Sequence, residues 1–448
     1  MEDTRKSELF DLVENKKFRI LKDELSAMNE FDVGEFLEEL DPEKKVVVFR
    51  MLPKELATDV FACLEVDTQQ HIINSITDTE LHGIIEDLYV DDAVDMLEEL
   101  PANVVRRVLE NATPSTRSQI NQFLKYPENS AGSIMTAEYV GLKKTMTVEE
   151  AFNYIRKFGQ DKEYIYTCYV MDSKRNLEGV VTVKDLLMNP YDTLIETIMD
   201  TNVIKAVTTE DQEHIAELFS NYDLMSLPVV DSENRLVGIV TVDDVVDVME
   251  EEATEDFEKM AAMLPSEKPY LKTSVFDIAK QRVPWLLILM ISSMITGGIL
   301  SHYEMAFQVL PLLVTFIPML MDTGGNAGSQ ASTTIIRGMA VGDIETSDVL
   351  KAWWKEIRVA VLVGLVLCIV NFVRLMIQYP NNTFVCLTVC ISLFFTVIIA
   401  KSLGCLLPIA AKKLRLDPAI MASPIITTMV DAISLTIYFG VAVALLHI

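Results

Sequence analysis

Apolar residues recur with a period of 12 between Phe36 and Ala112. Within each repeat they occupy positions i, i+1 and i+4, which lie on one face of a helix. Turn or helix-start signals such as Asp41-Pro42 and Pro101 follow the apolar groups. The pattern predicts short amphipathic helices of about two turns, which must stack because none can bury its apolar face alone. We therefore expect an all-α helical-repeat domain over residues 1–128.

A longer repeat follows between residues 134 and 250. Its clearest copies are Gly179-Val-Val-Thr-Val-Lys-Asp185 and Gly238-Ile-Val-Thr-Val-Asp-Asp244. Each half alternates apolar strands with helical segments, which is typical of a small α/β module. The paired motifs resemble a tandem pair of CBS domains, which usually serve as regulatory sensors. The resemblance implies α/β CBS domains over residues 129–192 and 193–248.

The pattern changes again after the second α/β copy. Val246 to Met263 is strongly acidic and predicts one exposed helix that ends before Pro265. We assign the acidic connecting helix to residues 249–272. Residues 273–448 then contain five apolar stretches, several of them longer than the roughly 18 residues that a membrane span requires. The stretches are Val283–Tyr303, Ala306 to about Met321, Val359–Ile377, Phe384–Ala411 and Ala419–Ile448. This pattern predicts a transmembrane domain of five α-helices.

Basic residues indicate how these stretches cross the membrane. Arg282 precedes the first stretch, and further Lys and Arg residues lie between the second and third and between the fourth and fifth. The two other loops, around Ser301–Glu304 and Tyr379–Thr383, contain none. Because basic loops stay in the cytoplasm, we expect a multi-pass protein of the cytoplasmic membrane, in contact with lipid, with a cytoplasmic amino terminus and an external carboxyl terminus. The first residues contain no apolar core of a cleaved signal peptide.

The formal net charge of −28 is concentrated in the first part of the chain. Residues 282–448 hold 10 Lys and Arg against 8 Asp and Glu, which leaves 28 basic and 58 acidic residues for residues 1–281. This acidic excess argues against nucleic acid as a partner and favours cations. The six cysteines are scattered, half or more of them in apolar stretches, which favours a reduced compartment over a disulfide framework.

Polar residues inside the apolar stretches indicate a path for ions. The glycine-rich run from Asp322 to Gln330 predicts an interrupted helix with unwound backbone, which a membrane tolerates only inside protein or beside a wet cavity. Helix packing through small residues is the alternative for this run. Asp431 lies about 18 Å beyond Ala419 along the last stretch, where a carboxylate costs at least ~2.5 kcal/mol. A bound cation or a wet pore would offset that cost, and an ion pair with Lys401 is the other interpretation.

The sequence motifs that contain these membrane residues resemble those of the MgtE family of magnesium channels. The resemblance rests on Gly324-Gly325-Asn326-Ala-Gly-Ser-Gln330, on Asp417-Pro418-Ala419 with Pro424 to Asp431, and on the order of helical repeat, CBS pair, connecting helix and five spans. It implies a Mg²⁺-selective uptake channel that is a homodimer with its pore on the twofold axis, Asp431 as the pore carboxylate and Asn326 beside it. Two Asp431 side chains would repel each other, and a divalent cation would relieve that repulsion better than a monovalent one. Asp322 is an additional carboxylate that departs from the family pattern.

The resemblance also implies regulation by cytoplasmic Mg²⁺. Ions bound between acidic faces of the domains would neutralise the repulsion between those faces and hold the domains together. The connecting helix would then lie against the pore and close it, so high cytoplasmic Mg²⁺ would reduce its own uptake by negative feedback. The implied ligands are Asp91 and Asp95 in the repeat domain, Asp223, Asp244 and Asp247 in and after the second CBS copy, Glu252, Glu255 and Asp256 in the connecting helix, and Asp417 at the membrane mouth. CBS pairs often bind ATP, but the two Thr-x-x-Asp sequences are equally compatible with structural helix starts.

Other interpretations of the function stay open. One is an ion-coupled carrier of divalent cations, and another is a membrane sensor whose CBS pair binds a nucleotide and whose spans carry no flux. The acidic connecting segment is also compatible with a solvated helix face, and Asp91 and Asp95 with ordinary positions on a repeat helix. An enzyme is not expected, because the sequence contains no P-loop, no zinc spacing among its histidines and no nucleophile with a base partner.

Overall fold

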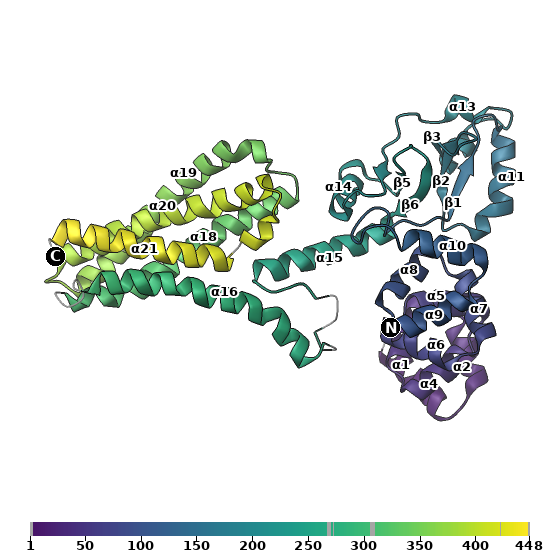
Figure 1. Ribbon diagram of the computed structural model, residues 1–448, viewed down its shortest axis with the longest axis horizontal. Coiled ribbons are helices and arrows are strands. Elements are labelled where there is room, and N and C mark those ends of the chain that lie inside the picture. The colour runs from purple at the N-terminus through teal and green to yellow at the C-terminus, as the bar shows by residue number, and fades with distance from the viewer. Residues whose placement is uncertain (1–2, 267–269, 272, 305–309, 422, 447–448) are drawn as a thin grey trace. The chain divides into compact units, whose positions relative to one another are not determined.

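The computed structural model describes residues 3–266, 270–271, 273–304, 310–421 and 423–446 (Figure 1). It divides into two compact units, Met1–Met249 and Glu250–Ile448. The first unit holds the helical repeats and the α/β modules, and the second holds the long apolar helices. Each unit is described by itself.

Short α-helices form the amino-terminal part of the first unit. From α3 to α10 they begin at 12-residue intervals between Glu30 and Pro114, which confirms the helical repeat expected from the sequence. The first apolar position of the repeat is buried in each helix from Phe36 in α3 to Val108 in α9. The helices are α1 (Asp3–Glu14), α2 (Phe18–Leu25), α3 (Glu30–Glu38), α4 (Pro42–Phe49), α5 (Lys54–Ala62), α6 (Val66–Ser75), α7 (Asp78–Asp87), α8 (Val90–Glu99), α9 (Ala102–Asn111) and α10 (Pro114–Phe123).

Local signals start these helices at the expected places. Pro42 and Pro114 occupy the beginning of α4 and α10, where the fixed φ of proline favours the helix and its missing N–H group is not needed. Thr77 and Glu80 form a capping box at α7, in which each side chain accepts a hydrogen bond from the backbone N–H group of the other residue. The repeat therefore combines an apolar face of about two turns with its own start signal.

Two three-stranded sheets follow, and both copies have the same topology. In each sheet the first strand pairs parallel to the second, and the second pairs antiparallel to the third. The first copy contains β1 (Tyr139–Leu142), α11 (Val148–Phe158), η1 (Gly159–Asp161), β2 (Tyr164–Met171), β3 (Leu177–Thr182) and α12 (Val183–Met188). The second contains α13 (Ile195–Ile198), β4 (Ala206–Val207), α14 (Gln212–Tyr222), β5 (Ser226–Val230) and β6 (Leu236–Thr241). The sequence repeat is therefore confirmed as a pair of α/β modules.

The repeated glycines allow the two modules to cross. A Cβ atom on Gly179 would lie 2.8 Å from the carbonyl oxygen of Asp200, and one on Gly238 would lie 2.5 Å from that of Thr136. Antiparallel bridges at both places join the leading segment of one copy to the last strand of the other. Glycine is needed at both positions because any side chain would collide with this crossing backbone.

Helix α15 (Val242–Met260) differs from the predicted acidic helix at both ends. It begins at Val242 rather than Val246, because the hydroxyl of Thr241 donates a hydrogen bond to Asp244 and starts the helix directly after β6. The same arrangement starts α12 in the first copy, so both Thr-x-x-Asp sequences are helix starts. The helix ends before the predicted Met263, since Ala262 adopts the left-handed conformation with φ 54°.

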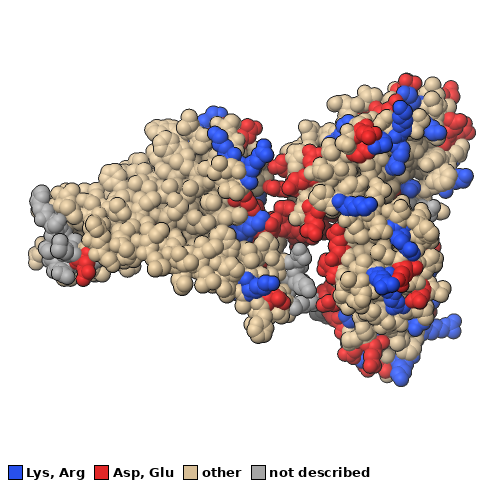
Figure 2. Space-filling view, viewed as in Figure 1, with Lys and Arg blue, Asp and Glu red and all other residues tan. Residues whose placement is uncertain are grey.

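Long apolar helices make up the second unit, where charged side chains are sparse over the visible face (Figure 2). Within the described residues, four segments are long and apolar enough to cross a membrane, namely Val275–His302, Thr346–Gln378, Thr383–Lys413 and Pro418–Leu446. The elements are α16 (Val275–His302), η2 (Pro311–Phe316), α18 (Ile317–Ala340), η3 (Thr346–Asp348), α19 (Val349–Gln378), α20 (Thr383–Lys413), η4 (Pro418–Met421) and α21 (Ser423–Leu446). The expected start of the second stretch, Ala306, and the end of the fifth, Ile448, lie outside the described residues.

The glycine-rich run does not interrupt a helix. Asp322 to Gln330 lies inside α18, which is continuous from Ile317 to Ala340, so the predicted unwinding is wrong. A Cβ atom on Gly324 would lie 2.7 Å from the methyl group of Thr396 in α20, and one on Gly328 would lie 2.7 Å from Ile426 in α21. The glycines therefore serve close helix packing, which was the alternative interpretation of this run.

Candidate metal sites

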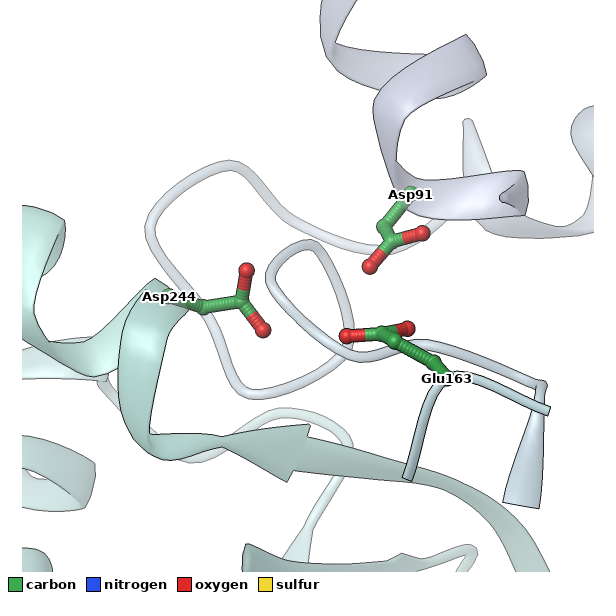
Figure 3. A group of neighbouring side chains, drawn as sticks. All are labelled: Asp91, Glu163 and Asp244. Atoms are coloured by element: carbon green, nitrogen blue, oxygen red, sulfur yellow. The ribbon is translucent and has the colours of Figure 1, made fainter. Parts of the chain in front are cut away.

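Three carboxylates from separate parts of the first unit converge on one point (Figure 3). Asp91 lies in the first turn of α8, Glu163 directly precedes β2, and Asp244 lies in the first turn of α15. One oxygen from each residue lies within 4.8 Å of the other two. Figure 3 shows the carboxylates pointing toward one another. We call Asp91, Glu163 and Asp244 the three-carboxylate site.

Burial leaves part of this site without hydrogen bonds. Asp91 is only 7% exposed, and its Oδ1 atom has no hydrogen-bond partner among the described residues. Glu163 has a buried Oε2 atom in the same situation. Asp244 is held in place at Oδ2 by the hydroxyl of Thr241. Because buried carboxylate oxygens without partners are costly, the arrangement favours a ligand that supplies positive charge.

Burial and mutual repulsion also change how these groups ionise. Burial raises the pKa of Asp91 well above its usual value, and the neighbouring Glu163 carboxylate raises it further. Burial is the main reason that the pKa of Glu163 rises to about 7 and the pKa of Asp244 to about 6. The pKa of Asp92 also rises to about 6, through burial and then the charge of Asp244. A divalent cation would compensate these charges, and Mg²⁺ is a hard cation that is bound through oxygen ligands such as carboxylates.

The site contains only part of the predicted ligand set. Asp91 and Asp244 lie together, whereas Asp95 and Asp247 are exposed about one turn farther along their helices and are not among the three grouped residues. Glu163 is not among the ligands predicted from the sequence. It lies in a short connection between a helix and a strand, where a single acidic residue has no periodic pattern to distinguish it.

Asp223 lies elsewhere in the first unit, at a cavity of about 730 Å³. It ends α14 in the left-handed conformation, with φ 51°. Residues of both CBS copies line the cavity, among them Tyr164, Tyr169, Lys184 and Asp200. The structure therefore does not place Asp223 with the three-carboxylate site, and the size of its cavity suits a small organic ligand.

A second acidic group lies in the second unit, at the carboxyl end of α15. The ammonium group of Lys259 lies 2.7 Å from Asp417 and also pairs with Glu255. The pKa of Asp256 rises to about 6, mainly through burial and then through the charge of Asp417, and Glu252 contributes to the same rise. The structure thus brings together Glu255, Asp256 and Asp417, three of the predicted ligands. We call these three residues the mouth site.

Asp431 lies within the last apolar helix. It is eight residues after the first residue of α21, or about 12 Å along the helix. Its Oδ1 atom is buried and has no hydrogen-bond partner in the described part of the chain. Asp322 of α18 is close enough for the two carboxylates to repel each other. Asn326 is exposed one turn after Asp322, on the same face of α18.

Lys401 is not the partner of Asp431. Its ammonium nitrogen lies 3.5 Å from a carboxylate oxygen of Glu356 in α19, and both side chains are largely buried. The interpretation of Asp431 as half of an ion pair with Lys401 is therefore wrong. Without that pair, the Asp431 carboxylate still needs a source of positive charge within the apolar helices.

Long apolar helices, a carboxylate within the last of them and a group of converging carboxylates in the first unit are features of the class of membrane proteins that transport divalent cations. The sequence profile of the MgtE family, described as a divalent cation transporter, matches residues 317–441. The profile of the MgtE intracellular N domain matches residues 28–129. The profile of the CBS domain matches twice, over residues 131–191 and 195–251. The chain belongs to the MgtE family of magnesium transporters, which confirms the resemblance seen in its sequence.

Curated relatives agree with this assignment over the whole length. The chain is 35% identical to the magnesium transporter MgtE of Thermus thermophilus, with 100% of both chains covered. It is 32% identical to the magnesium transporter MgtE of Bacillus subtilis, over 97% of this chain and 96% of the relative. Both relatives are named as magnesium transporters.

Solved structures match slightly more than half of the chain. The cytosolic domain of the Mg²⁺ channel MgtE in complex with ATP is 37% identical, with a TM-score of 0.52 over 54% of this chain and 99% of that one. The soluble part of a magnesium transporter is 29% identical, with a TM-score of 0.53 over 56% of this chain and 99% of that one. The predicted order of a helical domain, a CBS pair and apolar helices is therefore confirmed.

Proposed function

We propose that this protein is a Mg²⁺-selective channel that admits magnesium through the cytoplasmic membrane. Asp431 supports the proposal most directly, because its carboxylate lies in an apolar helix, has a buried oxygen without a hydrogen-bond partner among the described residues, and is not neutralised by Lys401. Such a carboxylate costs at least ~2.5 kcal/mol unless a cation compensates it. In a homodimer with its pore on the twofold axis, two Asp431 side chains would face the hydrated ion and Asn326 would lie beside them.

Magnesium uptake by a magnesium-dependent strain tests this proposal. Asp431→Asn keeps the side-chain volume and removes the charge, so uptake should fall to less than about a tenth of the wild-type rate. Asp343→Asn is the matched control, because Asp343 is an exposed carboxylate between α18 and η3, and uptake should stay unchanged. Single-channel currents in a bilayer separate a channel from a coupled carrier. Normal uptake by Asp431→Asn, or no ion flux through the wild-type protein, would contradict the proposal.

We also propose that cytoplasmic Mg²⁺ closes the channel. Mg²⁺ at the three-carboxylate site would replace repulsion by attraction and hold α8 against the CBS pair. A further ion at the mouth site would hold α15 to the segment that leads into α21. Both sites would fill as the internal Mg²⁺ concentration rises, which gives negative feedback. The roles of Asp95, Asp223, Asp247 and Glu252 as ligands stay predictions.

Asp91→Asn tests the three-carboxylate site through thermal stability. Removing a buried negative charge should raise the melting temperature without Mg²⁺, by about 2–4 °C for each kcal/mol of repulsion relieved, and should reduce the further rise on adding Mg²⁺. Glu98→Gln removes an exposed charge from the same helix and is the control. If Asp91→Asn kept the full Mg²⁺-induced rise, Asp91 would not be a ligand.

The cavity that Asp223 borders is proposed to bind ATP. The similar cytosolic domain of the Mg²⁺ channel MgtE is described in complex with ATP. In this chain the lining includes Tyr164 and Tyr166, whose rings suit a nucleobase, and Lys184, whose charge suits phosphate. Equilibrium dialysis of the purified protein with ATP tests this part of the proposal.

A further inference from the structure

The mouth site contains a cation that belongs to the chain itself. Lys259 lies one turn after Glu255 on α15, and its ammonium group contacts both Glu255 and Asp417. A Glu four residues before a Lys is the favourable order for a helical ion pair. The Lys259 side chain is 22% exposed, so it is held among the carboxylates rather than extended into solvent.

Both oxygens of Asp417 are already engaged. Oδ1 accepts a hydrogen bond of 2.7 Å from the backbone N–H group of Ala419, and Oδ2 lies 2.7 Å from the ammonium nitrogen of Lys259. The ammonium group of Lys259 already occupies the place between Glu255 and Asp417, so a divalent cation that bridges these two carboxylates would compete with it for that position. Lysine can vacate the position, because its charge is carried on a flexible four-carbon stem.

We propose that Lys259 competes with Mg²⁺ at the mouth site and so raises the cytoplasmic Mg²⁺ concentration that is needed to close the channel. The inference rests on the Mg²⁺ feedback proposed above and adds the residue that sets its threshold. Lys259 acts as a tethered inhibitor of ion binding, present at a fixed local concentration beside its two carboxylates.

The charges at the mouth site favour exchange between the two cations. When Glu255, Asp256 and Asp417 are ionised, the single positive charge of Lys259 leaves an excess of negative charge. Burial lowers the pKa of Lys259, but its hydrogen bonds to Asp417 and Glu255 raise it more, so the ammonium group stays charged. Mg²⁺ brings twice that charge to the same position. The tether favours Lys259 and the charge favours Mg²⁺, so the Mg²⁺ concentration decides which is bound.

Two measurements on the full-length protein test the inference. The first is the cytoplasmic Mg²⁺ concentration that halves the channel current in excised patches. The second is Mg²⁺ binding to the purified protein by calorimetry, with Glu255→Gln used to identify the heat from the mouth site. Lys259→Met should lower the half-inhibiting Mg²⁺ concentration and the dissociation constant of Mg²⁺ at the mouth site by about threefold to tenfold. This is the range expected for the loss of ion pairs that are partly exposed. Lys259→Arg keeps the charge and should stay within about twofold of wild type.

Controls separate competition from other effects. Lys280→Met removes the same charge from an exposed position on α16 and should leave the half-inhibiting Mg²⁺ concentration and the dissociation constant of Mg²⁺ unchanged. If Lys259 served only to hold α15 against Asp417, its loss would weaken closure, and the half-inhibiting concentration would rise instead. A rise or no change in Lys259→Met, with normal inhibition of the wild type, overturns the role of Lys259 alone. A wild-type channel that internal Mg²⁺ does not inhibit overturns the proposed feedback, and the threshold role with it.

Discussion

Glycines decide how closely the membrane helices approach one another. A Cβ atom on Gly404 of α20 would overlap the carbonyl oxygen of Gly328 in α18 and would lie 3.0 Å from the Cβ atom of Ala331. The two backbones are therefore in direct contact at this point. At Gly440 of α21, by contrast, no atom of the described residues, apart from the adjacent residues and the nearby backbone of the same helix, lies within 4 Å of the place that a Cβ atom would occupy.

Gly404→Ala should destabilise the second unit. The added methyl group meets backbone, which cannot move aside as a side chain can, so the cost should be at least about 1–3 kcal/mol and the melting temperature should fall by several degrees. Gly440→Ala is the matched control and should leave the melting temperature unchanged or slightly higher, because alanine favours a helix. The measurement is thermal unfolding in detergent, and equal melting temperatures for the two variants would refute this account of the packing.

The same residues show why the glycine-rich run was predicted incorrectly. Glycine, serine and asparagine are the residues expected where a helix unwinds, and glycine and serine are also those expected where helices touch. The choice depends on the partner, here Thr396 of α20 and Ile426 of α21, and neither is near the run in sequence. A single segment contains no information about such a neighbour.

At the scale of elements, the amino-terminal helices were predictable because their partners are local. Every helix from α3 to α9 buries the first apolar position of the repeat, and its neighbours are helices that come shortly before and after it in the chain, so the 12-residue period contains both the element and its packing. The CBS motifs were recognisable because the sequence itself repeats, with Gly179 and Gly238 at equivalent positions of the two copies. The end of α15 was less predictable, because Ala262 adopts a left-handed conformation that alanine rarely takes.

An ion pair joins α19 and α20 inside the membrane unit. Glu356 and Lys401 lie 3.5 Å apart with side-chain exposures of 13% and 6%. Glu356 Oε2 and Trp353 Nε1 are buried without a hydrogen-bond partner among the described residues, so little else compensates the Glu356 carboxylate. No sequence pattern indicated this pair, because the two residues are 45 positions apart on different helices.

Removing one partner of this pair should cost more than removing both. Lys401→Met or Glu356→Gln leaves a buried charge without compensation and should destabilise the protein by about 3–5 kcal/mol, whereas the double variant should recover most of that loss. Thermal unfolding of the four proteins forms a double-mutant cycle. Additive losses would mean that the two side chains do not interact.

For the molecule as a whole, the sequence predicted the excess of acidic residues but not which carboxylates converge in the folded protein. The acidic excess of residues 1–281 indicated a protein that binds cations, and the family resemblance pointed to Asp91 and Asp244. Glu163 completes the three-carboxylate site from a connection that only the folded α/β module brings near α8. Its contribution depends on tertiary structure, and so does the burial that raises the pKa of all three carboxylates.

Protons and Mg²⁺ should therefore compete for the first unit. Burial raises the pKa of Glu163 to about 7 and the pKa of Asp92 and Asp244 to about 6, so these groups take up protons on mild acidification. Burial raises the pKa of Asp91 as well. Raised carboxyl pKa values mean that the folded state binds protons more tightly than the unfolded state. Without Mg²⁺, stability should therefore fall as pH rises from about 4 to about 7.

Mg²⁺ binding should show the opposite dependence on pH. At about pH 6 the ion must displace protons from Glu163 and Asp244 that are largely absent at about pH 8, so its affinity should fall by up to tenfold per pH unit for each proton displaced. Adding Mg²⁺ to the purified protein in weak buffer should release protons near pH 6 and almost none near pH 8. Asp91→Asn should release fewer at the lower pH. If proton release were equal at both pH values, or absent at both, the buried carboxylates would not be the groups that bind Mg²⁺.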